Sequence, residues 1–158
     1  TQNQSQTMPV VEAVAASSAS TDCGLRSSYA DSVLRWCSPI QNYATQHNID
    51  PNLIAAVMQQ ESGGDPNAYS SSGAVGLMQV MPSDGIAATF YCAAGPCFAS
   101  RPSTQELLNP EFNISYGAGM LSGLLSRYQD VREALRAYGP LDVGYSYADT
   151  VLAIYGGY

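Results

Sequence analysis

The segment DPNLIAAVMQQESGGDPNAYSSSGAVGLMQ, residues 50–79, decides the fold because its first part carries a complete set of helix signals. Asp50 is a favourable N-cap, Pro51 suits the first helical position, and Gly63 with Gly64 ends the pattern. These signals predict a helix of about three turns. The Gly- and Ser-rich residues that follow are typical of a loop.

A carboxylate, Glu61, lies on the apolar face of this predicted helix. Steps of four residues lead from Leu53 through Val57 to Glu61, so its side chain should face the core. Burial disfavours the charged form of a carboxyl group, and so does the negative end of the helix dipole. Both effects raise the pKa, which suits a general acid near neutral pH. The alternative is that Glu61 turns its carboxylate into solvent and packs only its methylene groups.

Composition and charge fit one folded domain that does not bind nucleic acid. The chain has 158 residues, 46% of them hydrophobic, with thirteen acidic residues against six arginines and no lysine. A net charge of -7 without a dense basic run argues against nucleic acid and against an anionic membrane surface. No apolar run reaches the ~18 residues of a membrane-spanning helix. The N-terminus does not read as a signal peptide, so we expect a mature or trimmed chain.

The four cysteines predict disulfide bonds rather than a metal site. They lack metal-ligand spacing, and His47 is the only histidine, so we expect neither a metal nor a cofactor. We favour the pairs Cys23 with Cys37 and Cys92 with Cys97, which place the protein in an oxidising compartment. The alternative is four reduced, buried thiols.

Organisation along the chain predicts a flexible tether followed by an all-α domain. Residues 1–21 are rich in Ser, Thr, Gln and Ala without sustained periodicity, and 22–158 form the domain. A small irregular or hairpin segment is expected near Cys92 and Cys97. Helical patterns follow at about 28–37, 39–47, 51–62, 86–91, 110–128, 131–138 and 147–155.

The available chemistry is that of carboxylates. With a single histidine there is no Ser-His-Asp or Cys-His arrangement. Glycosidic cleavage needs an acid and usually a second carboxylate. The nearest candidates after Glu61 are Asp65 and Asp84, but Asp65 precedes a proline after two glycines, where a turn role is expected. A mechanism with one carboxylate is therefore favoured.

Several motifs together resemble the catalytic domain of lytic transglycosylases, the lysozyme-like enzymes of bacterial cell walls that are related to goose-type lysozymes. The resemblance covers roughly 39–158. It rests on ES (61–62), SGAVGLMQVMP (72–82), NPEFNISYGAGML (109–121), LRAYG (135–139) and YADTVLAIY (147–155). It implies a lysozyme-like helical domain with a substrate groove.

The resemblance also implies an activity and a role for each matching residue. Peptidoglycan would be cleaved at the β-1,4 bond between N-acetylmuramic acid and N-acetylglucosamine, leaving 1,6-anhydromuramic acid ends. Glu61 would act first as acid and then as base. Around it, the implied roles are orientation of the acid by Ser62, substrate contacts from Met78 and Gln79, packing beside the acid by Tyr138, and a hydrogen bond to the carboxyl from Tyr147.

Each supporting residue also has a packing explanation. Ser62 could only cap the helix end, Met78 could belong to the core, and both tyrosines lie on core-facing stripes. One position departs from the family: Gly139 stands where an asparagine is expected after Ala-Tyr, which puts the contacts of that asparagine in doubt.

Two other functions compete with this interpretation. A hydrolytic muramidase would use water positioned by Asp65 or Asp84, and a non-catalytic module would only bind peptidoglycan. For all three functions we expect a monomer that acts in the periplasm, outside the cell or on a phage virion. The tether could serve secretion, conjugation or phage assembly.

Overall fold

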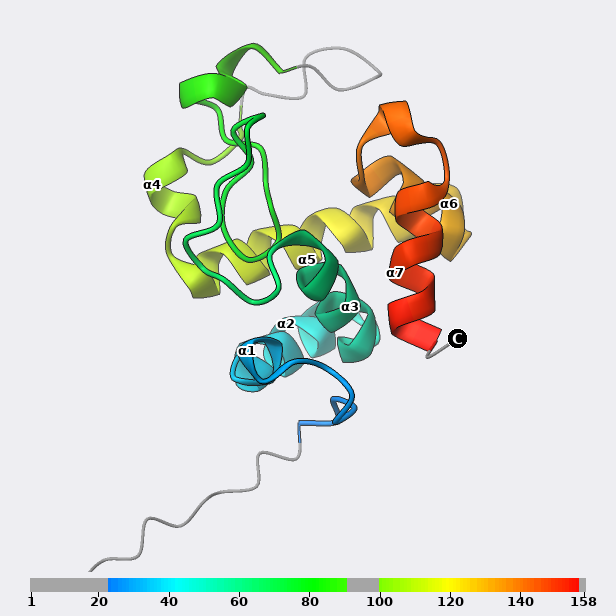
Figure 1. The fold of residues 1–158 in the computed structure, drawn as a ribbon. Coiled ribbons are helices and arrows are strands. Elements are labelled where there is room, and N and C mark those ends of the chain that lie inside the picture. Colours follow the sequence, from blue (N-terminus) through cyan, green and yellow to red (C-terminus); the bar gives the residue numbers. More distant parts are fainter. Residues whose placement is uncertain (1–22, 91–99, 157–158) are drawn as a thin grey trace, which may run out of the picture.

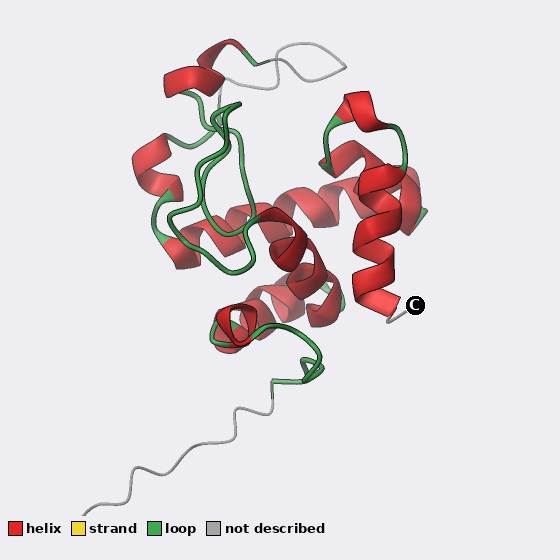
Figure 2. Cartoon of the chain, viewed as in Figure 1, coloured by secondary structure: helices red, strands yellow, loops and turns green. Residues whose placement is uncertain are grey.

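The computed structural model describes residues 23–90 and 100–156, and over these ranges the chain is helical and contains no strand (Figures 1 and 2). The all-α prediction is confirmed. The only β-type pairing in the described residues consists of two isolated antiparallel bridges. They join Val75 to Tyr69 and to Val80. The helices are α1 (Asp31–Leu34), α2 (Cys37–His47), α3 (Pro51–Glu61), α4 (Thr104–Leu107), α5 (Pro110–Tyr128), α6 (Val131–Tyr138) and α7 (Ser146–Gly156), with the 3-10 helices η1 (Gly85–Thr89) and η2 (Leu141–Val143).

Two predictions lie outside the described residues: the tether at 1–21 and the Cys92–Cys97 segment with its disulfide. None of the described helices is both long and apolar enough to cross a membrane.

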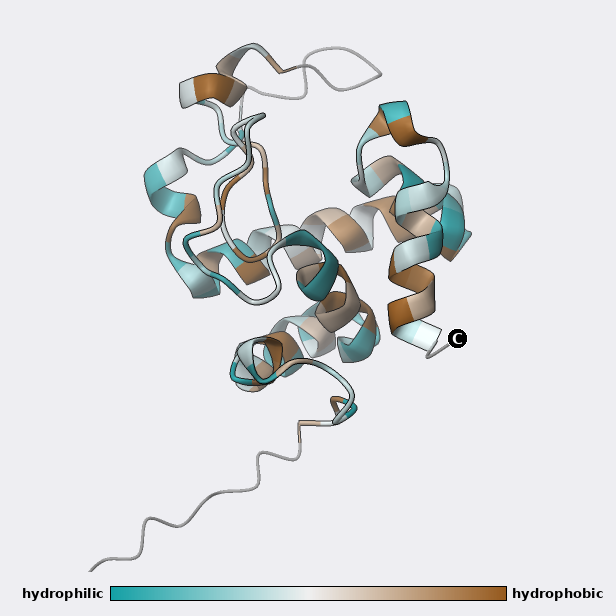
Figure 3. Cartoon of the chain, viewed as in Figure 1, coloured by the Kyte–Doolittle hydropathy of each residue, from teal (hydrophilic) through white to brown (hydrophobic). Residues whose placement is uncertain are grey.

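Helix α3 forms where its signals predict, and its central part is buried. The Asp50 side chain accepts a hydrogen bond from the Asn52 backbone N–H at 2.9 Å, and Pro51 occupies the first turn. Every residue from Leu53 to Met58 is buried, as expected for a helix that neighbours surround. Those neighbours are α1, α2 and α7. Apolar residues are visible on both α3 and α7 (Figure 3).

Helix α5, with 19 residues, is the longest of the described helices and supports several others. It runs from α4 to α6 in Figure 1 and packs against α2, α4 and α6. Asn109 caps it by accepting a hydrogen bond from the Phe112 N–H at 3.0 Å, and Pro110 begins the first turn. The predicted boundaries of this helix are therefore confirmed.

Asn113 of α5 fastens the loop 75–80 to this support. It is fully buried, and its Oδ1 accepts a hydrogen bond from the Met78 N–H at 2.7 Å. Its Nδ2 donates to the carbonyl oxygens of Val75 at 2.8 Å and Leu107 at 3.0 Å. One side chain thus satisfies three buried backbone groups, which fixes the loop next to the end of α3.

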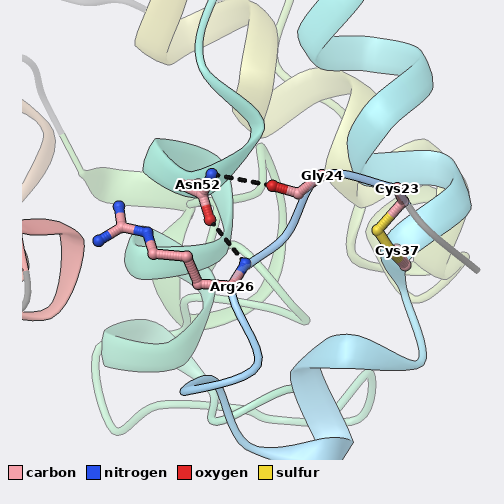
Figure 4. The surroundings of a disulfide bond; sticks show 5 residues. All are labelled: Cys23, Gly24, Arg26, Cys37 and Asn52. Atoms are coloured by element: carbon pink, nitrogen blue, oxygen red, sulfur yellow. Dashed lines mark hydrogen bonds between the residues drawn. A yellow bond between two sulfur atoms is a disulfide. The ribbon is translucent and has the colours of Figure 1, made fainter.

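The segment that precedes α1 is tied to both α2 and α3 (Figure 4). Cys23 and Cys37 form a disulfide bond to the start of α2. Asn52 of α3 accepts a hydrogen bond from the Arg26 N–H and donates one to the Gly24 carbonyl, each at 3.1 Å. These contacts hold the first described residues along the outer side of α3.

Several details of the sequence prediction were wrong. The short helix predicted over 86–91 is the 3-10 helix η1, Gly85–Thr89. The single helix predicted over 28–37 is interrupted: α1 ends at Leu34, and α2 begins at Cys37, ahead of the predicted start at Pro39. Proline is tolerated there because it lies within the first turn of α2. Helix α4 was missed, although Ser103 and Glu106 form a capping box whose spacing is visible in the sequence.

Candidate active site

Glu61 is the last residue of α3, and its side chain is partly buried. Burial raises the pKa of Glu61 from 4.5 to about 7, because the charged form loses hydration. A hydrogen bond from Tyr147 opposes this shift by stabilising the carboxylate. At neutral pH the carboxyl group therefore exists in both forms, so it can donate a proton and take one back.

Tyr147, in the first turn of α7, holds this carboxyl group in place. Its hydroxyl donates a hydrogen bond to Oε1 of Glu61 at 2.5 Å. Burial and the negative charge of Glu61 raise the pKa of Tyr147 well above its usual range, so the hydroxyl remains a donor. Since Oε1 accepts this bond, Oε2 is the carboxyl oxygen left free to carry the proton of the neutral acid.

We expect Tyr147→Phe to raise the pKa of Glu61 by about one unit, because a hydrogen bond to a charged group contributes about 1.5 kcal/mol or more. Carbon-detected NMR titration of the glutamate carboxyl groups measures the shift. The control is Tyr138→Phe, which removes a nearby hydroxyl that does not bond to Glu61. A Glu61 pKa that is unchanged in Tyr147→Phe would contradict the role of Tyr147.

Tyr138, the last residue of α6, faces the same carboxyl group but bonds elsewhere. Its hydroxyl donates to the backbone carbonyl of Met78 at 2.8 Å. Burial and the charge of Glu61 raise the pKa of Tyr138 well above its usual range. Tyr138 therefore connects α6 to the loop 75–80, and the structure brings α3, α6, α7 and this loop together around Glu61.

The loop 75–80 is a tight turn closed by two hydrogen bonds between the backbones of Val75 and Val80, at 2.9 and 3.1 Å. Gln79 lies in this turn with a φ of 50°, an uncommon conformation for a residue other than glycine. Its Nε2 donates to the carbonyl oxygens of Ala68 and Gly76 at 3.2 and 3.1 Å. The amide is thereby oriented with Oε1 as its remaining acceptor.

For Ser62 and Met78 the structure favours the packing alternatives. The Ser62 hydroxyl donates to the Leu77 carbonyl at 2.7 Å, which ties the end of α3 to the loop 75–80. The Met78 side chain is fully buried, and an added Cβ at Gly117 would lie 2.5 Å from its Cβ. The Met78 side chain therefore lies in the core, where it fills the space that Gly117 leaves in α5.

The two other candidate carboxylates are exposed and stabilise local structure. Asp65 accepts a hydrogen bond from the Asn67 N–H at 2.9 Å, which is the turn role predicted for it. Asp84 accepts from the N–H and the hydroxyl of Thr104, at 2.9 and 2.6 Å. In the described part of the chain, burial and Tyr147 account for the pKa of Glu61, and no second carboxylate contributes.

Residues of α1 and the adjoining turn support the end of α3, a role that the sequence did not indicate. Gly64 has a φ of 85°, and an added Cβ would lie 2.2 Å from the carbonyl oxygen of Ser32. The Gly64 carbonyl accepts hydrogen bonds from Arg35 Nη2 at 3.2 Å and Trp36 Nε1 at 3.0 Å. These contacts fix the turn that follows Glu61, and they join residues too far apart in sequence to be predicted from a local pattern.

Both the sequence and the fold of this chain are similar to those of known proteins. Residues 38–143 match the model of the transglycosylase SLT domain. The chain belongs to this family. It is also 38% identical over 105 residues to a transglycosylase of Enterobacteria phage PRD1, a match that covers 66% of this chain. The chain spans about a third of the length of that relative, 34%.

Two solved structures of lytic transglycosylases resemble this SLT domain, each with 28% sequence identity over 76% of the chain. One is an inactive mutant of Slt from Pseudomonas aeruginosa, with a TM-score of 0.57 and 24% of that chain covered. The other is the 70 kDa soluble lytic transglycosylase of Escherichia coli, with a TM-score of 0.51 and 18% covered. The prediction of a lytic transglycosylase-like helical domain is confirmed.

Proposed function

We propose that this SLT domain is a peptidoglycan lytic transglycosylase. It would cleave the β-1,4 bond between N-acetylmuramic acid and N-acetylglucosamine and leave 1,6-anhydromuramic acid ends. The observation that carries the proposal is Glu61: it is partly buried, has a pKa of about 7, and is held by Tyr147 without a second carboxylate in the described residues acting on it. The solved Slt mutant supports it, since a glutamate-to-glutamine replacement made that enzyme inactive.

Glu61 would act twice in this reaction. The neutral acid donates its Oε2 proton to the glycosidic oxygen as the bond from that oxygen to the muramoyl anomeric carbon breaks. The carboxylate then takes the proton of the muramoyl 6-hydroxyl as that oxygen bonds to the same anomeric carbon. Glu61 ends protonated, and no water is consumed. A pKa near the working pH suits a group that must perform both steps.

The remaining site residues would orient the acid and the sugar. Tyr147 fixes Oε1, which leaves Oε2 directed to the scissile bond. Gln79 has both amide hydrogens bonded to the carbonyl oxygens of Ala68 and Gly76, so its Oε1 would accept a hydrogen bond from a substrate N–H or O–H group. Ser62 and Tyr138 would act indirectly, by holding the loop that carries Gln79.

Action outside the cytoplasm or on a virion agrees with the phage relative and with the Cys23–Cys37 disulfide. We extend the proposal to residues 1–21 as a tether to a secretion, conjugation or phage assembly, and to a monomeric domain at 22–158.

The test is digestion of purified peptidoglycan followed by mass spectrometry of the released muropeptides. We expect anhydro ends from the wild-type protein. Products that end only in reducing muramic acid would instead indicate a hydrolytic muramidase. Binding of peptidoglycan without any released product would indicate a non-catalytic module, and either result would overturn the proposal.

A further inference from the structure

Gly139 lies in direct contact with the tyrosine that holds Glu61. It follows α6 with a φ of -79° and a ψ of -174°, a conformation open to any residue, so backbone strain does not require glycine here. Yet a Cβ added at Gly139 would lie 2.3 Å from Cδ1, 2.4 Å from Cγ and 2.8 Å from Cε1 of Tyr147. The Tyr147 ring therefore occupies the space that a side chain at 139 would fill.

Helix α7, which carries Tyr147, packs against α3 and α6 and buries Ala148 and Val151, so a shift of the whole helix would disturb the core. Arg132 of α6 binds Asp149 of α7 through two hydrogen bonds, at 2.7 and 3.0 Å. Tyr145 packs against the guanidinium groups of Arg132 and Arg136, and its hydroxyl donates to Glu133 at 2.5 Å. These contacts join α6 to the start of α7. A side chain at 139 would consequently have to move the Tyr147 ring rather than the whole helix.

We propose that Gly139 is a positioning residue: the absence of a side chain lets the Tyr147 ring pack on the backbone at 139, from where its hydroxyl reaches Oε1 of Glu61. The effect on cleavage rests on the proposed function, whereas the geometry does not. The same contact explains why glycine can stand at 139, where the family motif has asparagine. Because the ring fills this space, introducing asparagine, the residue expected from the family motif, should impair the site rather than restore it.

The variants Gly139→Ala and Gly139→Asn test this proposal, with Gly123→Ala as the matched control. Gly123 lies in α5, and a Cβ added there meets nothing within 4 Å. The first readout is the Glu61 pKa by NMR titration. The titratable groups that face Glu61 in the described chain are Tyr138 and Tyr147, and both stay protonated in the working range.

Both Gly139 variants should raise the Glu61 pKa by about one unit, as Tyr147→Phe does, since the same hydrogen bond is lost. Peptidoglycan cleavage should fall about tenfold or more, the rate equivalent of that bond. Adding Gly139→Ala to Tyr147→Phe should shift the Glu61 pKa by less than about 0.3 units and cleavage by less than about twofold, because coupled changes are not additive. Gly123→Ala should match the wild-type protein.

Unchanged pKa and cleavage in Gly139→Asn would overturn the proposal. If Gly139→Ala does not fold, the double variant Gly139→Ala/Tyr147→Ala tests the contact instead. This double variant lacks the ring that the new Cβ would meet. Recovered folding in this double variant supports the contact, and continued failure contradicts it. If the wild-type protein releases no anhydro products but the Gly139 variants still shift the Glu61 pKa, the proposed function fails and the positioning role stands.

Discussion

Glu61→Gln is expected to reduce peptidoglycan cleavage by roughly a thousandfold or more, because the amide can neither donate the acid's proton nor take one back. The change keeps the size and hydrogen-bonding oxygen of the side chain, so the fold should survive. Release of soluble muropeptides over time measures the loss. The matched control is Glu111→Gln, the same chemical change at an exposed position in the first turn of α5. Cleavage by Glu61→Gln within tenfold of wild type would remove Glu61 from its proposed role.

The same variant has a consequence for stability whose sign follows from the raised pKa. The folded protein holds the Glu61 proton more tightly than the unfolded chain, where the pKa is 4.5. The associated stability is complete below about pH 4.5 and is lost as the pH rises through about 7. As the pH rises over this range, the unfolding free energy of the wild-type protein should fall by up to about 3 kcal/mol because of Glu61. The unfolding free energy of Glu61→Gln should lack this contribution. The difference in urea unfolding free energy between the two proteins across this pH range isolates Glu61 from other titrating groups.

Asn113→Ala is expected to lower the unfolding free energy by about 3 kcal/mol or more, because it leaves three buried backbone groups without their partner. Urea denaturation followed by circular dichroism measures the change. The control is Asn42→Ala at an exposed position of α2, where a surface substitution should cost less than about 0.5 kcal/mol.

Asn113→Ala should also affect the candidate active site around Glu61. The loop 75–80 presents the Met78 carbonyl to Tyr138 and holds Gln79, so a loosened loop would weaken both contacts. A destabilisation of Asn113→Ala below about 1 kcal/mol would show that the loop is held by its own turn and not by α5.

The parts of the fold that the sequence predicted well are those with local signals. Asp50 and Pro51 for α3, and Asn109 with Pro110 for α5, lie within a turn of the helix they start, so a short window contains the whole cause. The first helix was predicted too long because apolar spacing continues through its end. The two residues between α1 and α2, Arg35 and Trp36, make long-range hydrogen bonds to the carbonyl of Gly64, which no local pattern indicates.

The candidate active site likewise has features that the sequence predicted and features that it did not. The burial of Glu61 followed from helical spacing, and the Tyr147 contact followed from family resemblance, which carries information about distant pairs. Neither source indicated that Asn113 holds the loop or that the Tyr147 ring packs on Gly139, because these contacts join residues that lie far apart or in different elements and leave no local pattern. Met78 lies within a family motif, and its fully buried side chain shows that a motif residue can serve the packing of the fold.

In the proposed reaction the substrate, and not water, supplies the nucleophile to a site with Glu61 as its acid and base. Digestion of peptidoglycan by the wild-type protein in heavy-oxygen water, followed by mass spectrometry, tests it most directly. We predict muramic acid ends that carry no heavy oxygen and are lighter than reducing ends by one water. Heavy oxygen at the anomeric carbon of the products released by the wild-type protein, and not by Glu61→Gln, would contradict it.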